Sequence, residues 1–387
     1  MTKCPRCFGA LTSDHYAWTR TAPDTAEVDE IASTYYGSPV RSGPVIELKR
    51  PDDADEEWTP PVGHAEREAG GDVAEVCPEC HYRLPSGWRG AQATCVAMAG
   101  ARATGKTVYI AVLIKSLQLL GERIGQMVEP ANAETENSYR ENYERPLYEE
   151  RGILEPTPAA HTGDPYQREP LIFSIGIWNG IRRYLVIRDV AGEDLENATN
   201  MGAASMRFFS RADGVVFMFD PLRVDSVRDQ LHDLVPAQER VGGDPRSVLR
   251  TVLSIIGTGT PNLAVVLSKF DALQALAHVD GGEWSEIMSQ RGAAYSRDPS
   301  LQKGPYNEPD GLLLHEEVRS LLDKLEAKAM VMAVEQPHTG VHVNSRYFAV
   351  SALGASPAGD RLHENGISPF RCLDPVRWVL AQHEVWV

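Results

Sequence analysis

Two short patterns hold the side chains best suited to chemistry, and the first is rich in glycine. Residues 100–107 match GxxxxGK[ST]. In such a loop, backbone N–H groups wrap phosphate oxygens and the N-terminus of the following helix adds partial positive charge. We therefore expect Lys106 to reach the β- and γ-phosphates of a nucleotide and Thr107 to bind Mg²⁺. The candidate nucleotide-binding residues here are Gly100, Ala101, Arg102, Ala103, Thr104, Gly105, Lys106 and Thr107.

The second pattern is a pair of CPxC motifs, Cys4/Cys7 and Cys77/Cys80. Two such pairs supply four thiolates for tetrahedral Zn²⁺, and a site closed in this way is structural. The 69 residues between Cys7 and Cys77 exceed the usual spacing of about 15–20. The intervening chain must therefore leave and return at adjacent points. Redox-active or free thiols are the alternatives to a metal site.

The remaining cysteines, Cys95 and Cys372, stand alone and are expected to be small buried side chains. The N-terminus shows no apolar export signal, so paired thiols in a reducing cytoplasm are expected. The longest apolar run, Val108 to Ile114, has seven residues, whereas a membrane helix needs about 20. We therefore expect no membrane span.

A carboxylate ends another apolar run. Residues 184–189 lead into Asp189-Val190-Ala191-Gly192, a DxxG sequence. An acid at the end of a strand can hold Mg²⁺ through water, and the Gly192 N–H can meet the γ-phosphate and so sense its loss. A threonine from an earlier loop should complete the Mg²⁺ coordination. Thr157 is preferred, and Thr162 is the alternative.

Two later segments could recognise a base. Residues 268–271, Ser-Lys-Phe-Asp, resemble the [NT]KxD guanine motif, in which the carboxylate accepts from guanine N1–H and the 2-amino group. The stem of Lys269 could lie over the base. The segment Ser351-Ala352-Leu353 resembles the loop whose backbone contacts guanine O6. The candidate base-binding residues are thus Ser268, Lys269, Asp271, Ser351, Ala352 and Leu353.

The glycine-rich loop, the DxxG sequence and the two base-recognition segments each follow a short apolar run that is typical of a strand. Helical patterns separate the runs, which predicts an α/β fold with a largely parallel sheet covered on both faces. The expected strands are 94–99, 171–178, 183–188, 214–219, 263–267 and 347–350. The expected helices are 105–120, 133–151, 198–211, 224–238, 314–334 and 376–385.

The order of these motifs resembles the Ras-like, translation-factor-related (TRAFAC) class of P-loop GTPases, over residues 91–387. The resemblance implies a mostly parallel six-stranded sheet flanked by helices, a GTP/GDP cycle and Mg²⁺. With the cysteine pairs, it extends to large bacterial GTPases that carry an N-terminal zinc ribbon, some of them encoded with conflict or signalling systems. A GTP-dependent molecular switch is the function it implies.

The sequence departs from that class at three positions. Ser268 replaces the usual Asn or Thr, which keeps an ATPase as an alternative. Glu193 follows DxxG where many members have a glutamine that orients water, so we expect slow hydrolysis or a catalytic group from elsewhere. Arg102 could act as an arginine finger in cis within a nucleotide-dependent dimer, or could simply face solvent. A nucleotide-binding scaffold with little hydrolysis is therefore a further alternative.

The charge is unevenly distributed. The chain has 387 residues and a net charge of −16, and residues 8–76 alone carry 15 acidic and 5 basic residues. This acidity argues against nucleic acid as a partner and favours a protein effector or regulator. The run from Pro51 to Glu57 predicts a solvated, mobile segment, and Val45 to Lys49 a short strand. We expect a zinc ribbon at 1–90 with an acidic insertion at 8–76, and a GTPase domain at 91–387 with insertions near 121–169, 239–260 and 275–344.

Overall fold

The computed structural model describes residues 2–55, 58–152, 154, 169–196, 203–225, 227, 243–278, 283–355, 362 and 366–385. A seven-stranded sheet forms its centre. The strands follow the order β12 (Ser345–Ala349), β11 (Asn262–Leu267), β10 (Gly214–Phe219), β6 (Gln92–Gly100), β9 (Ile181–Arg188), β8 (Leu171–Trp178) and β7 (Glu129–Pro130).

Five neighbouring strands of this sheet, from β12 to β9, are parallel. Strand β8 runs antiparallel to β9, and β7 runs antiparallel to β8. The expectation of a mostly parallel α/β sheet is confirmed, but the number of strands was one too few. The extra strand, β7, has two residues, one of them a proline, and pairs Pro130 with Phe173. Such a short edge strand leaves no apolar pattern to find.

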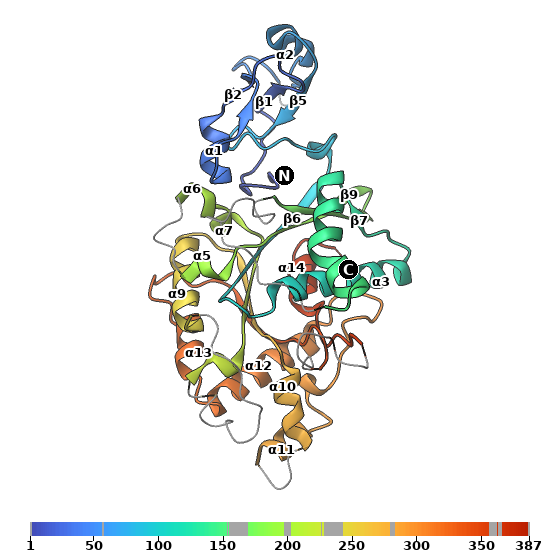
Figure 1. Cartoon of the computed structure of the whole chain (residues 1–387), viewed down its shortest axis with the longest axis vertical. Helices are drawn as coiled ribbons and strands as arrows, with labels where there is room; N and C mark the ends of the chain where they lie inside the picture. Colours follow the sequence, from blue (N-terminus) through green and yellow to red (C-terminus); the bar gives the residue numbers. More distant parts are fainter. Residues whose placement is uncertain are drawn as a thin grey trace.

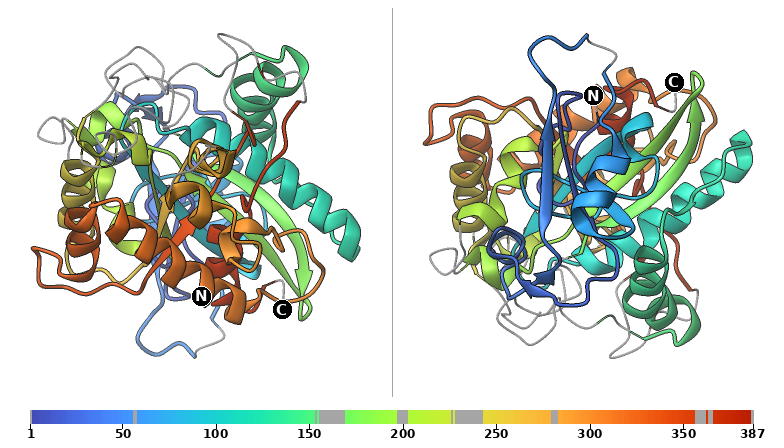
Figure 2. Two further views of the ribbon diagram at one scale, coloured as in Figure 1. Left: turned by 90° about the horizontal axis from the view of Figure 1, so that it is seen from below. Right: turned by 90° about the horizontal axis from the view of Figure 1, so that it is seen from above.

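Helices cover the sheet on both faces, with α5, α9 and α13 on one side and α3 and α14 on the other (Figure 1). The turned views agree (Figure 2). The interior strands are buried from both sides, which explains their continuous apolar runs. The bounds are α3 (Lys106–Ile124), α5 (Gly192–Glu196), α9 (Pro245–Ile256), α13 (Lys328–Glu335) and α14 (Asp374–Ala381).

Further helices fill the connections. The expected helix 133–151 is present as an α-helix that continues as a π-helix containing Pro146. The remaining helices are α4 (Ala133–Tyr139), η2 (Arg140–Glu149), α6 (Ala203–Met206), α7 (Phe208–Arg211), η5 (Pro221–Arg223), α10 (Asp271–Gln274), η6 (Ala275–His278), α11 (Glu283–Met288), η7 (Ala294–Ser296) and α12 (Glu308–Lys324). Most of the expected helix 224–238 lies outside the described residues.

The acidic stretch between the cysteine pairs is folded, and it lies at one end of the long axis of the molecule (Figure 1). It forms a three-stranded antiparallel sheet, and Trp18, Ile46 and Ala65 make a small separate core. The predicted strand at Val45–Lys49 is confirmed, whereas its neighbours were missed. Asp52 and Asp53 are exposed, as expected of the acidic run. The elements are β1 (His15–Arg20), β2 (Glu27–Val28), α1 (Glu30–Tyr36), β3 (Arg41–Ser42), β4 (Val45–Lys49), α2 (Val62–Ala69), β5 (Val73–Val76) and η1 (Trp88–Gly90).

The cysteine-bearing segments belong to a different part of the interior. All four cysteines, with Phe8 and Trp88, are buried in the same continuous cluster as the central sheet. Strands β1 and β5 pair antiparallel, with Arg20 opposite Val73. This pairing brings the chain that leaves one cysteine pair back beside the other, which accommodates the long gap between Cys7 and Cys77.

Candidate functional site

The glycine-rich loop joins β6 to α3, as the sequence predicts. Gly100 ends the strand with φ 148°, and a Cβ there would lie 2.3 Å from the carbonyl oxygen of Met218. Gly105 caps the helix with φ 86°, and Ala103 also has a positive φ of 63°. These positive φ values let the chain turn sharply between the end of a buried strand and the start of the helix.

The side chain of Lys106 is buried in this loop. Its Nζ donates to the backbone carbonyls of Gly100 (2.9 Å) and Ala101 (3.3 Å). Burial lowers the pKa of Lys106, and the charges of Asp189 and Glu196 oppose that shift. The amine is therefore held over the loop, with two carboxylates close enough to act on it. An anion placed there would give the ammonium a negatively charged partner in place of neutral carbonyls.

The DxxG segment lies directly against the phosphate loop. Asp189 follows β9 and is 5% exposed, and Thr107 in the first turn of α3 is 7% exposed. A Cβ on Gly192 would lie 2.3 Å from the backbone nitrogen of Arg102 and 2.5 Å from the carbonyl carbon of Ala101. Only a glycine fits this approach. The structure thus brings together Lys106, Thr107, Asp189 and Gly192.

Two acidic side chains of α5 face the loop. Glu193 lies 3.8 Å from the guanidinium of Arg102, and both side chains are partly exposed. Glu196 accepts a hydrogen bond from the backbone N–H of Arg102 (3.0 Å) and another from that of Gly243 (2.9 Å). Glu193 was singled out from the sequence because it follows the DxxG motif, but its contact with Arg102 was not predicted. Glu196 was missed, since its spacing from the glycine belongs to no motif.

The base-recognition segments also meet. The Ser351 hydroxyl donates to the carboxylate of Asp271 at 2.6 Å, and Ser351 also accepts from the N–H of Gly354. The Ser268 hydroxyl donates to the carbonyl of Phe219 (3.0 Å), which fixes this short side chain at the end of β11. The segments after β11 and β12 are therefore tied together through Asp271. Ala352 and Leu353 follow as a partly buried turn.

Lys269 pairs with a carboxylate that the sequence analysis did not name. It has a positive φ of 52°, and its ammonium lies 3.0 Å from the carboxylate of Asp220. Asp220 is fully buried at the end of β10. The sequence contained a signal for it, because Phe217-Met218-Phe219-Asp220 is an apolar strand ending in an acid, the same pattern that identified Asp189.

The threonines considered for the first switch, Thr157 and Thr162, both lie outside the described residues. Thr107 and Asp189 are oxygen donors of the kind that Mg²⁺ prefers, at one edge of the sheet.

The four cysteines fit a tetrahedral metal. Their Sγ atoms all lie within 4.8 Å of one another. Cys4 and Cys80 approach to 3.5 Å, and Cys7 and Cys77 to 3.8 Å. Sulfurs bound tetrahedrally at about 2.3 Å from Zn²⁺ are about 3.8 Å apart, whereas a disulfide requires about 2.0 Å. The Gly9 N–H also donates to the Cys7 sulfur, as it would to a thiolate. The cluster could therefore hold Zn²⁺.

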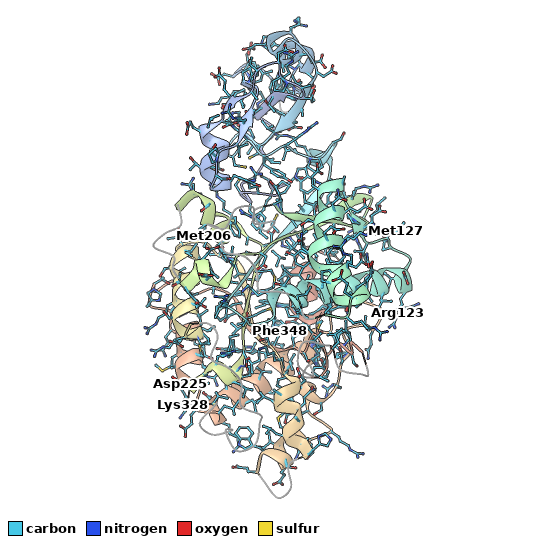
Figure 3. The ribbon with its side chains drawn as sticks, in the orientation of Figure 1. Arg123, Met127, Met206, Asp225, Lys328 and Phe348 are labelled. Carbon is cyan, nitrogen blue, oxygen red and sulfur yellow. The ribbon has the colours of Figure 1, made fainter. Side chains whose placement is uncertain are left out.

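The cysteine segments rest on the chain that flanks Asp189. Arg188 donates to the backbone carbonyl of Arg6 and lies 3.9 Å from the centre of the Phe208 ring. Phe8 packs edge-on against the same ring. Glu79 accepts from Arg211 at 2.7 Å. Phe208 and Arg211 both belong to α7. Met206, in the preceding helix α6, is labelled in Figure 3.

A phosphate loop at the carboxyl edge of a parallel α/β sheet, with Asp189 on one side and the Asp271–Ser351 pair on the other, is the arrangement of a GTP-binding P-loop protein. The chain belongs to the double-GTPase 2 family, whose model matches residues 94–324.

A relative from Mycolicibacterium smegmatis is 53% identical over 383 residues, which cover 98% of this chain and 99% of the relative. Its provisional name is ESX-1 scaffolding and assembly protein SaeC. A structure of the bacterial selenocysteine-specific elongation factor EF-Sec is 13% identical, with a TM-score of 0.26 over 66% of this chain. The chain spans about a quarter of that factor, and this similarity is too low to bear on function.

Within the described residues, no helix is both long enough and apolar enough to cross a membrane.

Proposed function

We propose that this chain is a GTP-dependent molecular switch that hydrolyses GTP slowly and presents a zinc-bound N-terminal segment to a protein partner in the cytoplasm. The observation that carries the proposal is the packing of Gly192 on the backbone of Arg102. The segment that would sense the γ-phosphate therefore already touches the loop that would hold it. A phosphate arriving there must change this contact, which is what a switch requires.

The residues of the site divide the work of binding. The loop from Gly100 to Thr107 would wrap the phosphates, with Lys106 as the charged contact. Asp271, positioned by Ser351, would read the guanine edge, and the backbone of 351–353 would contact O6. Thr107 and Asp189, with Thr157 or Thr162 from the first switch, would hold Mg²⁺, which neutralises charge on the phosphates when bound.

The acidic residue after DxxG supports slow turnover. Glu193 carries the negative charge where a neutral side chain usually orients water, and it lies beside Arg102. Arg102 could neutralise developing charge only after leaving Glu193, for example when a second chain binds. Single-turnover hydrolysis by Arg102→Ala, followed at low and high protein concentration, tests this role. A rate equal to that of the wild type at both concentrations would exclude it.

The cysteine segments would serve as the output of the switch. Arg188 precedes Asp189 and is covered by the Arg6 backbone, while Glu79 pairs with Arg211 at the other end of the same region. A change around Asp189 would therefore reach both CPxC motifs. The acidic insertion attached to them is suited to a basic protein surface.

The decisive experiment compares affinity and turnover for GTP and ATP, each with and without Mg²⁺. A switch binds GTP in preference to ATP and shows Mg²⁺-dependent hydrolysis. Preference for ATP, or binding of neither nucleotide, would refute the proposal.

The second candidate is a nucleotide-binding scaffold with little hydrolysis. The Glu193–Arg102 pair favours it, because each side chain offsets the charge that the other would bring to the reaction. The provisional name of the relative, a scaffolding and assembly protein, points the same way. Tight GTP binding without turnover over hours, also with a partner present, would identify this alternative.

A further inference from the structure

Glu196 holds a backbone donor of the phosphate loop. Its Oε1 accepts from the N–H of Arg102 at 3.0 Å and from the N–H of Gly243 at 2.9 Å. The two donors come from different parts of the chain, the phosphate loop and the residue before the N-cap of α9, Asp244. One carboxylate oxygen therefore connects three segments: α5, the loop and the start of α9.

The close approach of α5 aims this carboxylate. Gly192 begins the helix in contact with the loop backbone, so the side chain four residues later also meets the loop, because residues four apart share a helix face. The charge of Glu196 also acts on Lys106, whose pKa it raises against the effect of burial. A negative charge of the protein itself therefore sits within the field of the phosphate-binding amine.

A phosphate loop presents N–H groups and a lysine because its ligand is an anion. A carboxylate that accepts from one of these N–H groups occupies a donor that a phosphate would otherwise use, and it carries a negative charge as the phosphate does. A nucleoside triphosphate brings its γ-phosphate to the side of the loop where Gly192 lies, whereas a diphosphate has no group there. The two nucleotides should therefore differ in whether they encounter Glu196.

We propose that Glu196 sets the selectivity of this chain for GDP over GTP, because its carboxylate competes with the γ-phosphate for the backbone N–H of Arg102. This proposal rests on the proposed GTP switch and adds its regulation. When GTP binds, Glu196 must leave both donors, which releases the start of α9 from α5. When the γ-phosphate is lost, the carboxylate returns and holds α5 against the loop.

The test measures the affinities of the full-length chain for fluorescent GDP and for a fluorescent non-hydrolysable GTP analogue. In Glu196→Ala and Glu196→Gln, binding of the GTP analogue should tighten by about tenfold, while binding of GDP should change by less than about twofold. Glu196→Gln keeps the size of the side chain and an oxygen acceptor, so it isolates the charge. Asp194→Asn, which removes the same charge from the same helix, should leave the ratio of the two affinities unchanged.

Each result has one meaning. Equal changes for both nucleotides in Glu196→Gln, or weaker binding of the GTP analogue in both variants, would show that Glu196 only supports the structure and would overturn the proposal. A shift in Asp194→Asn as large as in Glu196→Gln would also overturn it, because general electrostatics would then suffice. A wild type that binds neither nucleotide would instead refute the proposed function, and this inference with it.

Discussion

The guanidinium of Arg188 donates a hydrogen bond of 2.6 Å to the backbone carbonyl of Arg6. Arg188 ends β9 one residue before Asp189, and Arg6 lies between the first two cysteines. The nucleotide side and the cysteine side of the protein therefore share one buried contact. Burial lowers the pKa of Arg188 to about 10, so this group remains charged at neutral pH.

Replacing Arg188 should therefore destabilise the chain. Arg188→Met would leave the Arg6 carbonyl buried without this donor and remove the cation from the Phe208 ring, at a cost of about 1–3 kcal/mol. Denaturant unfolding of both proteins measures the difference. Arg182→Met on the same strand is the control, because Arg182 is exposed and should change stability by less than about 0.5 kcal/mol. Equal stability of Arg188→Met and wild type would show that the contact contributes nothing.

Lys106→Ala should weaken GTP binding by about 100-fold, because charge-assisted contacts contribute about 1.5–3 kcal/mol each. Equilibrium binding of fluorescent GTP provides the measurement. Lys115→Ala is the matched control on α3, since the Lys115 ammonium pairs with Glu144 rather than facing the loop. Retention of the wild-type affinity in Lys106→Ala would place the phosphate site elsewhere.

Asp271→Asn should shift the preference of the base site from guanine toward xanthine. The amide offers a donor where the carboxylate accepts from guanine, and xanthine supplies a matching oxygen. Competition between GTP and xanthosine triphosphate reports the shift. Ser351→Ala, which removes the hydrogen bond that positions Asp271, should weaken GTP binding without favouring xanthine. An unchanged GTP preference in Asp271→Asn means that another residue reads the base.

Removal of the cysteine ligands should release the metal and destabilise the N-terminal segment. The purified chain should contain about one Zn²⁺, and Cys4→Ser with Cys77→Ser should lose it, because a closed site needs all four thiolates. Elemental analysis and thermal unfolding check both points. Cys95→Ser is the control, since Cys95 lies in β6 outside the cluster and its loss should leave the metal content unchanged. A metal-free wild type that is fully folded would rule out the metal site.

The central sheet was predictable because its interior strands are buried on both faces, and because β6, β9, β11 and β12 each lead into a motif. Lys106, Asp189 and Asp271 were predicted for this reason, and their segments follow β6, β9 and β11 at the carboxyl edge of the sheet. Glu196 and Asp220 were not found as site residues. Glu196 acts through a backbone N–H that only the folded loop presents, and Asp220 follows the expected strand 214–219 without belonging to a motif.

The acidic insertion shows a second limit of prediction from the sequence. Its high charge concealed β1 and β5, which are short and together bury only Ala17, Trp18 and Val76. The packing of both CPxC motifs on the central domain was equally hidden. Its contacts, Arg188 with Arg6 and Arg211 with Glu79, join residues far apart in the sequence. Single exposed-looking charges carry no pattern that indicates a buried partner.

All six cysteines are buried, and burial raises the pKa of Cys95 and Cys372 well above the usual thiol value. Native protein should therefore react slowly with alkylating reagents. A cysteine introduced at an exposed position, such as Thr34→Cys in α1, would be the fast-reacting thiol. The fold thus provides a low background of reactive thiols for attaching a single fluorophore. Helix α1 contacts α6, so such a probe would report movement between the N-terminal segment and α6.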